Sequence, residues 1–168
     1  SYIYTINVVR LQLAADNTQT SESGGTTVAD GVSVSTSYKL GDTVITGITP
    51  GTGASSVLAN ISAGSGTVKV LKADGTENTG AVGTGNKIAV YANGTLVKQY
   101  DVVIYGDING DGKISVVDLV MMQKQILGTS QLSGAYAAAA DISRDGKVSV
   151  KDLVLLQKHI INAAQIEQ

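Results

Sequence analysis

The chain has 168 residues and a formal net charge of −2, so charge gives no argument for binding to nucleic acid or to an anionic membrane surface. It contains no Cys, which excludes disulfides, thiolate metal sites and a cysteine nucleophile, and no Trp or Phe, which disfavours a carbohydrate-binding face built on aromatic rings. No apolar run approaches the roughly twenty residues that are needed to cross a bilayer.

The first part of the chain, residues 1 to about 105, is rich in Gly, Thr, Ser and Val, and its short runs alternate between apolar and polar side chains. Its first run, residues 1–13, is either a strand of this domain or the last strand of a preceding repeat. Residues 14–27 have the small polar composition of a loop. We then predict short strands in residues 32–40, 43–48, 57–61 and 67–72.

A hairpin is predicted near the end of this part. Asn93-Gly94 is a turn dipeptide whose residues tolerate positive φ, and it joins the runs 87–92 and 95–105. Many short strands at this spacing predict an all-β, immunoglobulin-like antiparallel sandwich over residues 1–105. This part has no His, no paired carboxylates framed by apolar residues and no Ser in a nucleophile setting, so we predict a supporting module and not an enzyme.

The second part, residues 106–168, contains one sequence pattern twice, starting at Asp107 and again at Asp141. In each copy, oxygen-bearing side chains occupy the first, third and fifth places, Gly the sixth, an aliphatic residue the eighth and Asp the twelfth. This is the ligand spacing of a calcium-binding EF-hand loop, in which Gly lets the chain reverse so that alternate residues point their oxygens inward. Two copies with the same flanking residues predict calcium binding.

Each loop leads into a helix. The predicted helices are residues 116–127 and 150–162; the first loop is entered from a strand, and the second follows a segment, 133–140, that is long enough only for a short helix. Ser115 and Ser149 each stand three places before an Asp, which is a helix-capping signal. The twelfth-place Asp of each loop therefore has two competing roles, capping and cation binding, and a water-mediated role for the two Ser is open.

The duplicated loop–helix pattern resembles the dockerin family, whose modules anchor enzymes and scaffold subunits to cohesins in cellulosomes and related surface assemblies. The resemblance covers residues 106 to about 163. It rests on Gly-Asp-Ile-Asn-Gly-Asp-Gly-Lys-Ile in the first loop, on the Asp that closes each loop and on the Gln-Lys pair late in each helix. A β-domain that runs directly into this pattern resembles an X-module–dockerin pair. The implied fold class is two domains, an all-β sandwich at residues 1–105 and a small all-α dockerin at residues 106–168.

By resemblance, the two loops would hold two calcium ions. The ligands would be Asp107, Asn109, Asp111, Asp118 and the Lys113 carbonyl for the first ion, and Asp141, Ser143, Asp145, Asp152 and the Lys147 carbonyl for the second. Ser143 replaces the usual Asn or Asp, so we expect the second site to be the weaker one.

The two exiting helices carry matching apolar stripes when residues are placed at about 100° per step. One stripe of each helix suffices for the helices to pack on each other: Leu119, Met122 and Ile126, and Leu153, Leu156 and Ile160. A second stripe lies beside it: Val116, Val120, Gln123 and Leu127, and Val150, Val154, Gln157 and Ile161. This arc is wider than a small two-helix core can bury. Either the β-domain or the short middle helix covers the excess, or it is an exposed surface for a partner.

In the dockerin family, cohesin contacts fall at the tenth and eleventh loop places and on this helix face. Those places hold Val116-Val117 and Val150-Lys151 here, where many dockerins carry small hydroxyl residues, so we expect a more hydrophobic interface. Lys124 and Lys158 would supply charges at its rim. Because the two stripes match nearly residue by residue, two docking orientations are open to a partner.

These observations predict a non-catalytic, calcium-dependent module that docks to a cohesin of a scaffoldin or cell-surface protein and anchors its parent protein in an extracellular assembly, as in anaerobic bacteria. The β-domain would pack on the dockerin as a rigid support, because only Gly106 separates the last strand from Asp107. The alternative is a calcium-stiffened stalk or adhesion segment without a cohesin, in which the β-domain covers the second stripe. A calcium sensor is disfavoured by the missing entering helix and by Asp at the twelfth place.

Overall fold

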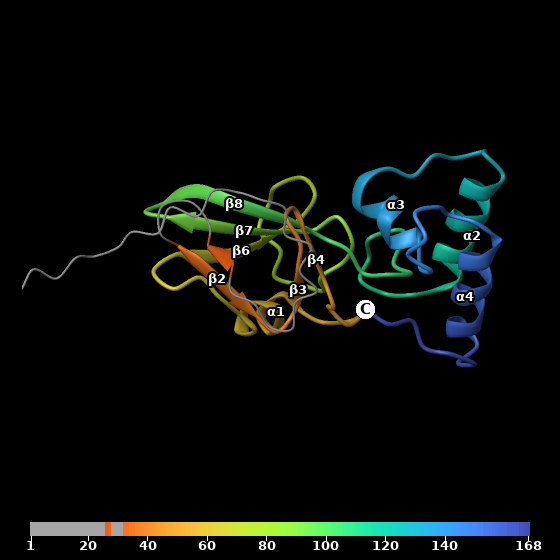
Figure 1. The fold of residues 1–168 in the computed structure, drawn as a ribbon, viewed down its shortest axis with the longest axis horizontal. Helices are drawn as coiled ribbons and strands as arrows, with labels where there is room; N and C mark the ends of the chain where they lie inside the picture. The colour runs from red at the N-terminus through yellow and green to blue at the C-terminus, as the bar shows by residue number, and fades with distance from the viewer. Residues whose placement is uncertain (1–25, 28–31) are drawn as a thin grey trace, which may run out of the picture.

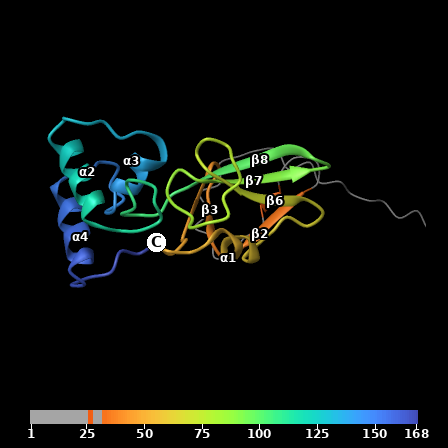
Figure 2. The same cartoon turned by 180° about the vertical axis from the view of Figure 1, so that it is seen from behind.

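The computed structural model describes residues 26–27 and 32–168. The predicted strand at residues 1–13, and residues 14–25 of the predicted loop, lie outside this range. The strands gather at one end of an elongated molecule and the last three helices at the other, and the C-terminus returns to the junction between them (Figure 1) (Figure 2). Within the described residues, no helix is long and apolar enough to span a membrane.

The larger sheet has five strands in the order β3-β4-β8-β7-β6. Their bounds are β3 Lys39–Leu40, β4 Val44–Thr46, β6 Thr67–Leu71, β7 Lys87–Ala92 and β8 Thr95–Val102. Strands β7 and β8 form the predicted hairpin, and its turn residues Asn93 and Gly94 have φ angles of 50° and 80°. Strand β4 runs parallel to β8, with Val44 opposite Asp101, so the sheet is mixed.

A smaller sheet and one short helix complete this end of the molecule. The sheet has the order β1-β2-β5, with β1 at Thr26–Thr27, β2 at Ser33–Thr36 and β5 at Ile61–Ser62, and the helix α1 spans Ala54–Ala59. Side chains from both sheets and from α1 meet in one hydrophobic cluster, in which Val34, Ile45, Val57 and Tyr100 are fully buried. Burial of each aliphatic side chain among them contributes roughly 1.5–3 kcal/mol to stability.

The predicted fold class is wrong. The N-terminal part is not an all-β antiparallel sandwich, because β4 and β8 are parallel and α1 occupies the start of the predicted strand 57–61. Helix α1 continues to Ala59 and buries Ala54 and Val57, a three-residue spacing that fits one turn of a helix. The all-α description of the second part is not confirmed either, since two irregular loops make up much of it.

Three helices form the other end of the molecule. They are α2 (Val116–Ile126), α3 (Gly134–Ala140) and α4 (Val150–Ile160), close to the predicted bounds. Helices α2 and α4 pack on each other and bury Met122 and Leu156 completely. The other residues of the predicted packing stripes, Leu119, Ile126, Leu153 and Ile160, are partly buried in the same cluster. This second cluster is separate from that of the N-terminal part.

Candidate functional site

The first loop runs from Asp107 to Asp118, and its first carboxylate is fully buried. Asp107 accepts hydrogen bonds from N of Gly110 at 2.9 Å and of Gly112 at 3.1 Å, and from N of Thr84, in the N-terminal part, at 2.8 Å. Burial raises the pKa of the Asp107 carboxyl to about 6, against the opposing effect of these N–H donors. No Lys or Arg of the described chain forms an ion pair with this carboxylate.

The closing carboxylate, Asp118, is also fully buried and connects the loop to the start of α2. Its Oδ1 accepts from N of Ile108 at 2.8 Å and of Asn109 at 3.0 Å, and its Oδ2 accepts from N and Oγ of Ser115 at 2.8 and 3.1 Å. Ser115 Oγ in turn accepts from Val117 N, which completes a capping box. The predicted capping role of this Asp is therefore confirmed.

The third and fifth places of the first loop bond to the loop's own backbone. Asn109 Oδ1 accepts from Asp111 N at 3.0 Å, and Asp111 Oδ1 accepts from Lys113 N at 2.8 Å. Gly110 and Gly112 have φ angles of 77° and 80°, which side-chain-bearing residues rarely adopt. These bonds hold the loop in the tight reversal that its sequence predicts.

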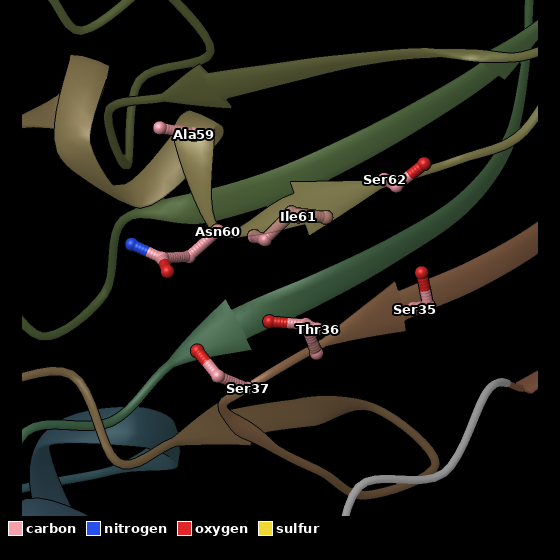
Figure 3. Close-up of a pocket in the computed structure, with 7 residues that line it drawn as sticks. All are labelled: Ser35, Thr36, Ser37, Ala59, Asn60, Ile61 and Ser62. Atoms are coloured by element: carbon pink, nitrogen blue, oxygen red, sulfur yellow. The ribbon is translucent and has the colours of Figure 1, made fainter.

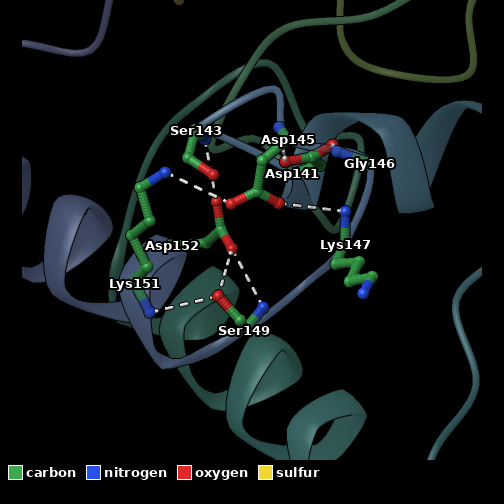
Figure 4. A network of polar contacts seen from close by, with 8 residues as sticks. All are labelled: Asp141, Ser143, Asp145, Gly146, Lys147, Ser149, Lys151 and Asp152. Atoms are coloured by element: carbon green, nitrogen blue, oxygen red, sulfur yellow. Dashed lines mark hydrogen bonds and ion pairs between the residues drawn. The ribbon is translucent and has the colours of Figure 1, made fainter.

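The second loop repeats this geometry (Figure 4). Asp141 accepts from Asp145 N at 3.1 Å, and the fully buried Asp152 accepts from N of Ser143 at 2.8 Å and of Ser149 at 2.9 Å. Ser149 forms the second capping box at the start of α4. The repeat in sequence is thus a repeat in structure.

Two features distinguish the second loop from the first. Ser143 Oγ, at the third place, is buried and has no hydrogen-bond partner among the residues that the structure describes. Lys151 Nζ lies 3.2 Å from Asp145 Oδ2, and its bond to this carboxylate lowers the pKa of Asp145. The first loop has Val117 at the corresponding place, so it has no such ion pair.

The donors of both loops suit a hard cation such as calcium, because they are carboxylate, amide, hydroxyl and carbonyl oxygens. Within the described residues, no three Asp, Glu, His or Cys side chains form a ready-made metal cluster. The third-place residues, Asn109 and Ser143, have an amide and a hydroxyl and no carboxylate. The predicted seventh-place donors are the backbone carbonyls of Lys113 and Lys147, and the side chains of these two residues are exposed. The unpartnered Ser143 oxygen and the buried, unneutralised Asp107 are nonetheless features that a bound cation would satisfy.

The second apolar stripe of α2 and α4 is exposed. We call the following residues, all of them exposed, the docking face: Val116, Val117, Val120, Gln123, Lys124, Leu127, Val150, Lys151, Val154, Gln157, Lys158 and Ile161. The exposed fraction of its apolar side chains runs from 40% at Val154 to 75% at Leu127. Over the range that the structure describes, neither the N-terminal part nor α3 covers this face.

The N-terminal part offers a weaker candidate, a shallow depression of about 370 Å³ between β2 and β5 (Figure 3). Its lining consists of Ser35, Thr36, Ser37, Ala59, Asn60, Ile61 and Ser62. None of these side chains is charged or aromatic, so the depression has neither a general acid or base nor a stacking platform.

The sequence analysis missed the residues that connect the two parts of the molecule. Besides Thr84, the side-chain amide of Gln168 accepts from Tyr105 N at 2.8 Å and donates to Tyr105 O at 3.0 Å. The guanidinium of Arg144 lies 4.5 Å from the centre of the Tyr105 ring. Lys39 Nζ donates to Gln168 O at 2.7 Å. These contacts join residues far apart in sequence, so no local motif marks them.

A comparison with protein families finds a match in the second part of the chain. The family model of the dockerin type I domain matches residues 105–161. The match covers both loops and helices α2–α4, and confirms the resemblance to dockerins for these residues. It does not extend to the N-terminal part, for which the resemblance to an X-module is not confirmed.

One similar solved structure is a complex from Acetivibrio cellulolyticus, described as the third cohesin ScaC with the ScaB dockerin, which carries a mutation in its N-terminal helix and displays a type I interaction. The alignment has 25% sequence identity, covers 39% of this chain and 92% of that chain, and has a TM-score of 0.37. A TM-score this low does not establish a shared fold. Comparison with curated proteins gives no match.

Proposed function

We propose that the chain is a non-catalytic, calcium-dependent protein-binding module that docks to a cohesin. The docking face carries this proposal: two helices related by a sequence repeat leave matching apolar side chains uncovered, in the segment that matches the dockerin type I domain. Contiguous apolar residues on a folded surface mark interaction sites. Cohesins are the partners of dockerins, and a cohesin with an apolar contact surface would bury this face.

The geometry connects each loop directly to the docking face. Val116 and Val117 follow Ser115 without a break, and the capping box fixes the first turn of α2 on which they lie. Their exposed fractions are 60% and 55%, so a partner could bury most of both side chains. Lys124 and Lys158 would lie at the rim, where charges contribute to specificity and association rate more than to affinity.

Calcium would order the loops that position this face. The ligands would be Asp107, Asn109, Asp111, Asp118 and the Lys113 carbonyl in the first loop, and Asp141, Ser143, Asp145, Asp152 and the Lys147 carbonyl in the second. Because each loop brings several carboxylates together, the bound ion would offset their repulsion and contribute its binding free energy to folding.

The domain boundary in this proposal lies between residues 105 and 106. Two observations support it: the two hydrophobic clusters share no residue, and the chain passes between them once in sequence, around Tyr105. The N-terminal part would act as a rigid support and not as a tether, since Gly106 N donates to Ala139 O at 2.9 Å and Val103 N to Ile45 O at 3.0 Å on either side of this point. The parent protein would thereby be anchored in a cellulosome-like or cell-surface assembly outside the cell.

The alternative of a calcium-stiffened stalk without a cohesin requires the N-terminal part to cover the second stripe. Exposed fractions of 42% at Val120 and 40% at Val154 argue against it. No second function is proposed.

The test is a pull-down from the surface proteins of the source organism, with the full chain as bait and mass spectrometry to identify the captured proteins. We expect a cohesin-containing protein to be captured in calcium and lost in EDTA. The double variant Val120→Asp/Val154→Asp should lose it as well, because two charges would be buried in an apolar interface. Leu96→Asp is the matched control, since Leu96 lies on β8 and is 48% exposed. Capture that is equal in EDTA, or eluates without any cohesin, would refute the proposal.

A further inference from the structure

The first loop is built against the N-terminal part of the chain, whereas the second is not. A Cβ on Gly83 would overlap Gly110 O and lie 2.7 Å from Gly112 N, and a Cβ on Gly112 would lie 2.6 Å from Val82 O. Real side chains do not approach backbone atoms this closely, so the two segments touch through bare backbone. By contrast, a Cβ on Gly146, the sixth-place Gly of the second loop, would meet nothing within 4 Å.

Hydrogen bonds reinforce the contact with the first loop. Thr84 N donates to Asp107 Oδ2 at 2.8 Å, and Gly51 N donates to Gly112 O at 2.7 Å. Thr84 is itself held in place, because its side chain is buried and its Oγ1 accepts from Ile104 N at 3.1 Å. The first-place carboxylate and the turn of the first loop are therefore both fixed from outside the loop.

The first- and fifth-place carboxylates of the second loop are bonded within the loop, although Arg144 of the same loop contacts the Tyr105 ring and donates to Glu167 O. In the described structure, Asp141 accepts hydrogen bonds only from Asp145 N and Gly146 N, both of the same loop. Its fifth-place carboxylate, Asp145, is engaged by Lys151, so an incoming cation has to compete with an ammonium group. In the part of the chain that the structure describes, no N-terminal residue donates a hydrogen bond to Asp141 as Thr84 does to Asp107.

We infer that residues 82–85 are a positioning segment for the first loop, and that the two loops therefore respond unequally to calcium. The first loop keeps its turned shape without the ion and binds it more tightly, because the cost of ordering the loop is already met by folding of the N-terminal part. The second loop is ordered by the ion itself. This inference deepens the proposed function and rests on it for the identity of the ion.

The test uses the full wild-type chain in chelator, with backbone amide exchange followed by NMR. The amides of Gly110 and Gly112 should exchange at least about tenfold more slowly than those of Asp145 and Gly146. This ratio is expected if the first loop keeps its hydrogen bonds to the Asp107 carboxylate while the second loop loses those to Asp141. Equal exchange in the two loops would overturn the inference.

A calcium titration by calorimetry gives the second readout. Gly83→Ala should weaken the tighter site roughly tenfold, since it separates Asp107 from Thr84, and should leave the weaker site unchanged. Gly80→Ala is the matched control, because a Cβ on Gly80 would meet only Asn78 Oδ1, at 3.6 Å. The variants Asp111→Ala and Asp145→Ala each remove one predicted ligand from one loop. The binding heat that each variant loses is thereby assigned to that loop.

These results separate the inference from the proposed function. If Gly83→Ala weakens both sites alike, or neither, the positioning role is refuted even though calcium binds. If no heat accompanies calcium addition but the exchange difference persists, the calcium proposal fails and the positioning role stands. Should Gly83→Ala fail to fold, judged by lost protection in β7 and β8, the wild-type exchange comparison decides.

Discussion

Lys151 is one of two loop residues, with Arg144, that give the second repeat a charge where the first has none. It occupies the place of Val117 and forms an ion pair with Asp145, a predicted ligand of the second loop. We expect Lys151→Val to raise the calcium affinity of the second loop by roughly two- to fivefold, the range for loss of one exposed ion pair. Calorimetry of the full chain measures it. Lys158→Val is the control, because it removes the same charge from α4 outside the loop, at a residue that forms no ion pair within the described residues; an equal gain there would contradict the ion-pair explanation.

Ser149 gives a second prediction at the scale of one residue. Its Oγ accepts from Lys151 N and donates to Asp152 Oδ2, so it caps α4. Ser149→Ala should lower stability in calcium by about 1 kcal/mol, the usual effect of losing a cap. That corresponds to a fall in Tm of about 4–8 °C for a unit of this size. Ser130→Ala, at an exposed residue outside the helices, should leave Tm unchanged. An unchanged Tm in Ser149→Ala would show that the cap does not stabilise the helix.

At the scale of elements, α2 and α4 present the same face twice. Val117 and Lys151 are the clearest difference between the two copies, since one is apolar and the other charged. We expect the exchange variant Val117→Lys/Lys151→Val to reverse the preferred orientation of the bound cohesin, as seen in co-crystals. An orientation that does not change would show that these two residues do not set it.

The loops and their helices could be predicted because their signals are local. Ligand spacing, capping Ser and apolar stripes all lie within a few turns of chain, and the observed bounds of α2 and α4 agree with them. The N-terminal part was predicted less well. Its strands are short, α1 has a residue pattern that also fits a strand, and the parallel pairing of β4 with β8 joins residues too far apart to leave a local signal.

Tertiary contacts at the candidate site were the hardest to foresee. Val-Gly-Thr-Gly at residues 82–85 reads only as a loop, yet Thr84 bonds the first carboxylate of the cation loop. Likewise, nothing in the last residues of the sequence indicates that Gln168 pairs with the backbone of Tyr105. Such contacts depend on how the two parts are placed in space, which no pattern of residues in one segment encodes.

At the scale of the whole molecule, calcium should control the packing of one end and not of the other. In EDTA we expect α4 to lose its fixed start, and α2 and α4 then to lose the contact that buries Met122 and Leu156. Circular dichroism should report a loss of helical signal that calcium restores, while amides of β6, β7 and β8 stay protected from exchange. A helical signal unchanged by EDTA would contradict a role for calcium in folding.

The account as a whole rests on docking through the face shared by α2 and α4. Its most direct test is amide exchange of the full chain, in calcium, with and without the captured cohesin. We predict slower exchange along α2 and α4 and no change in β6–β8, because only the docking face would be covered. Protection confined to the N-terminal strands, with α2 and α4 unaffected, would contradict it.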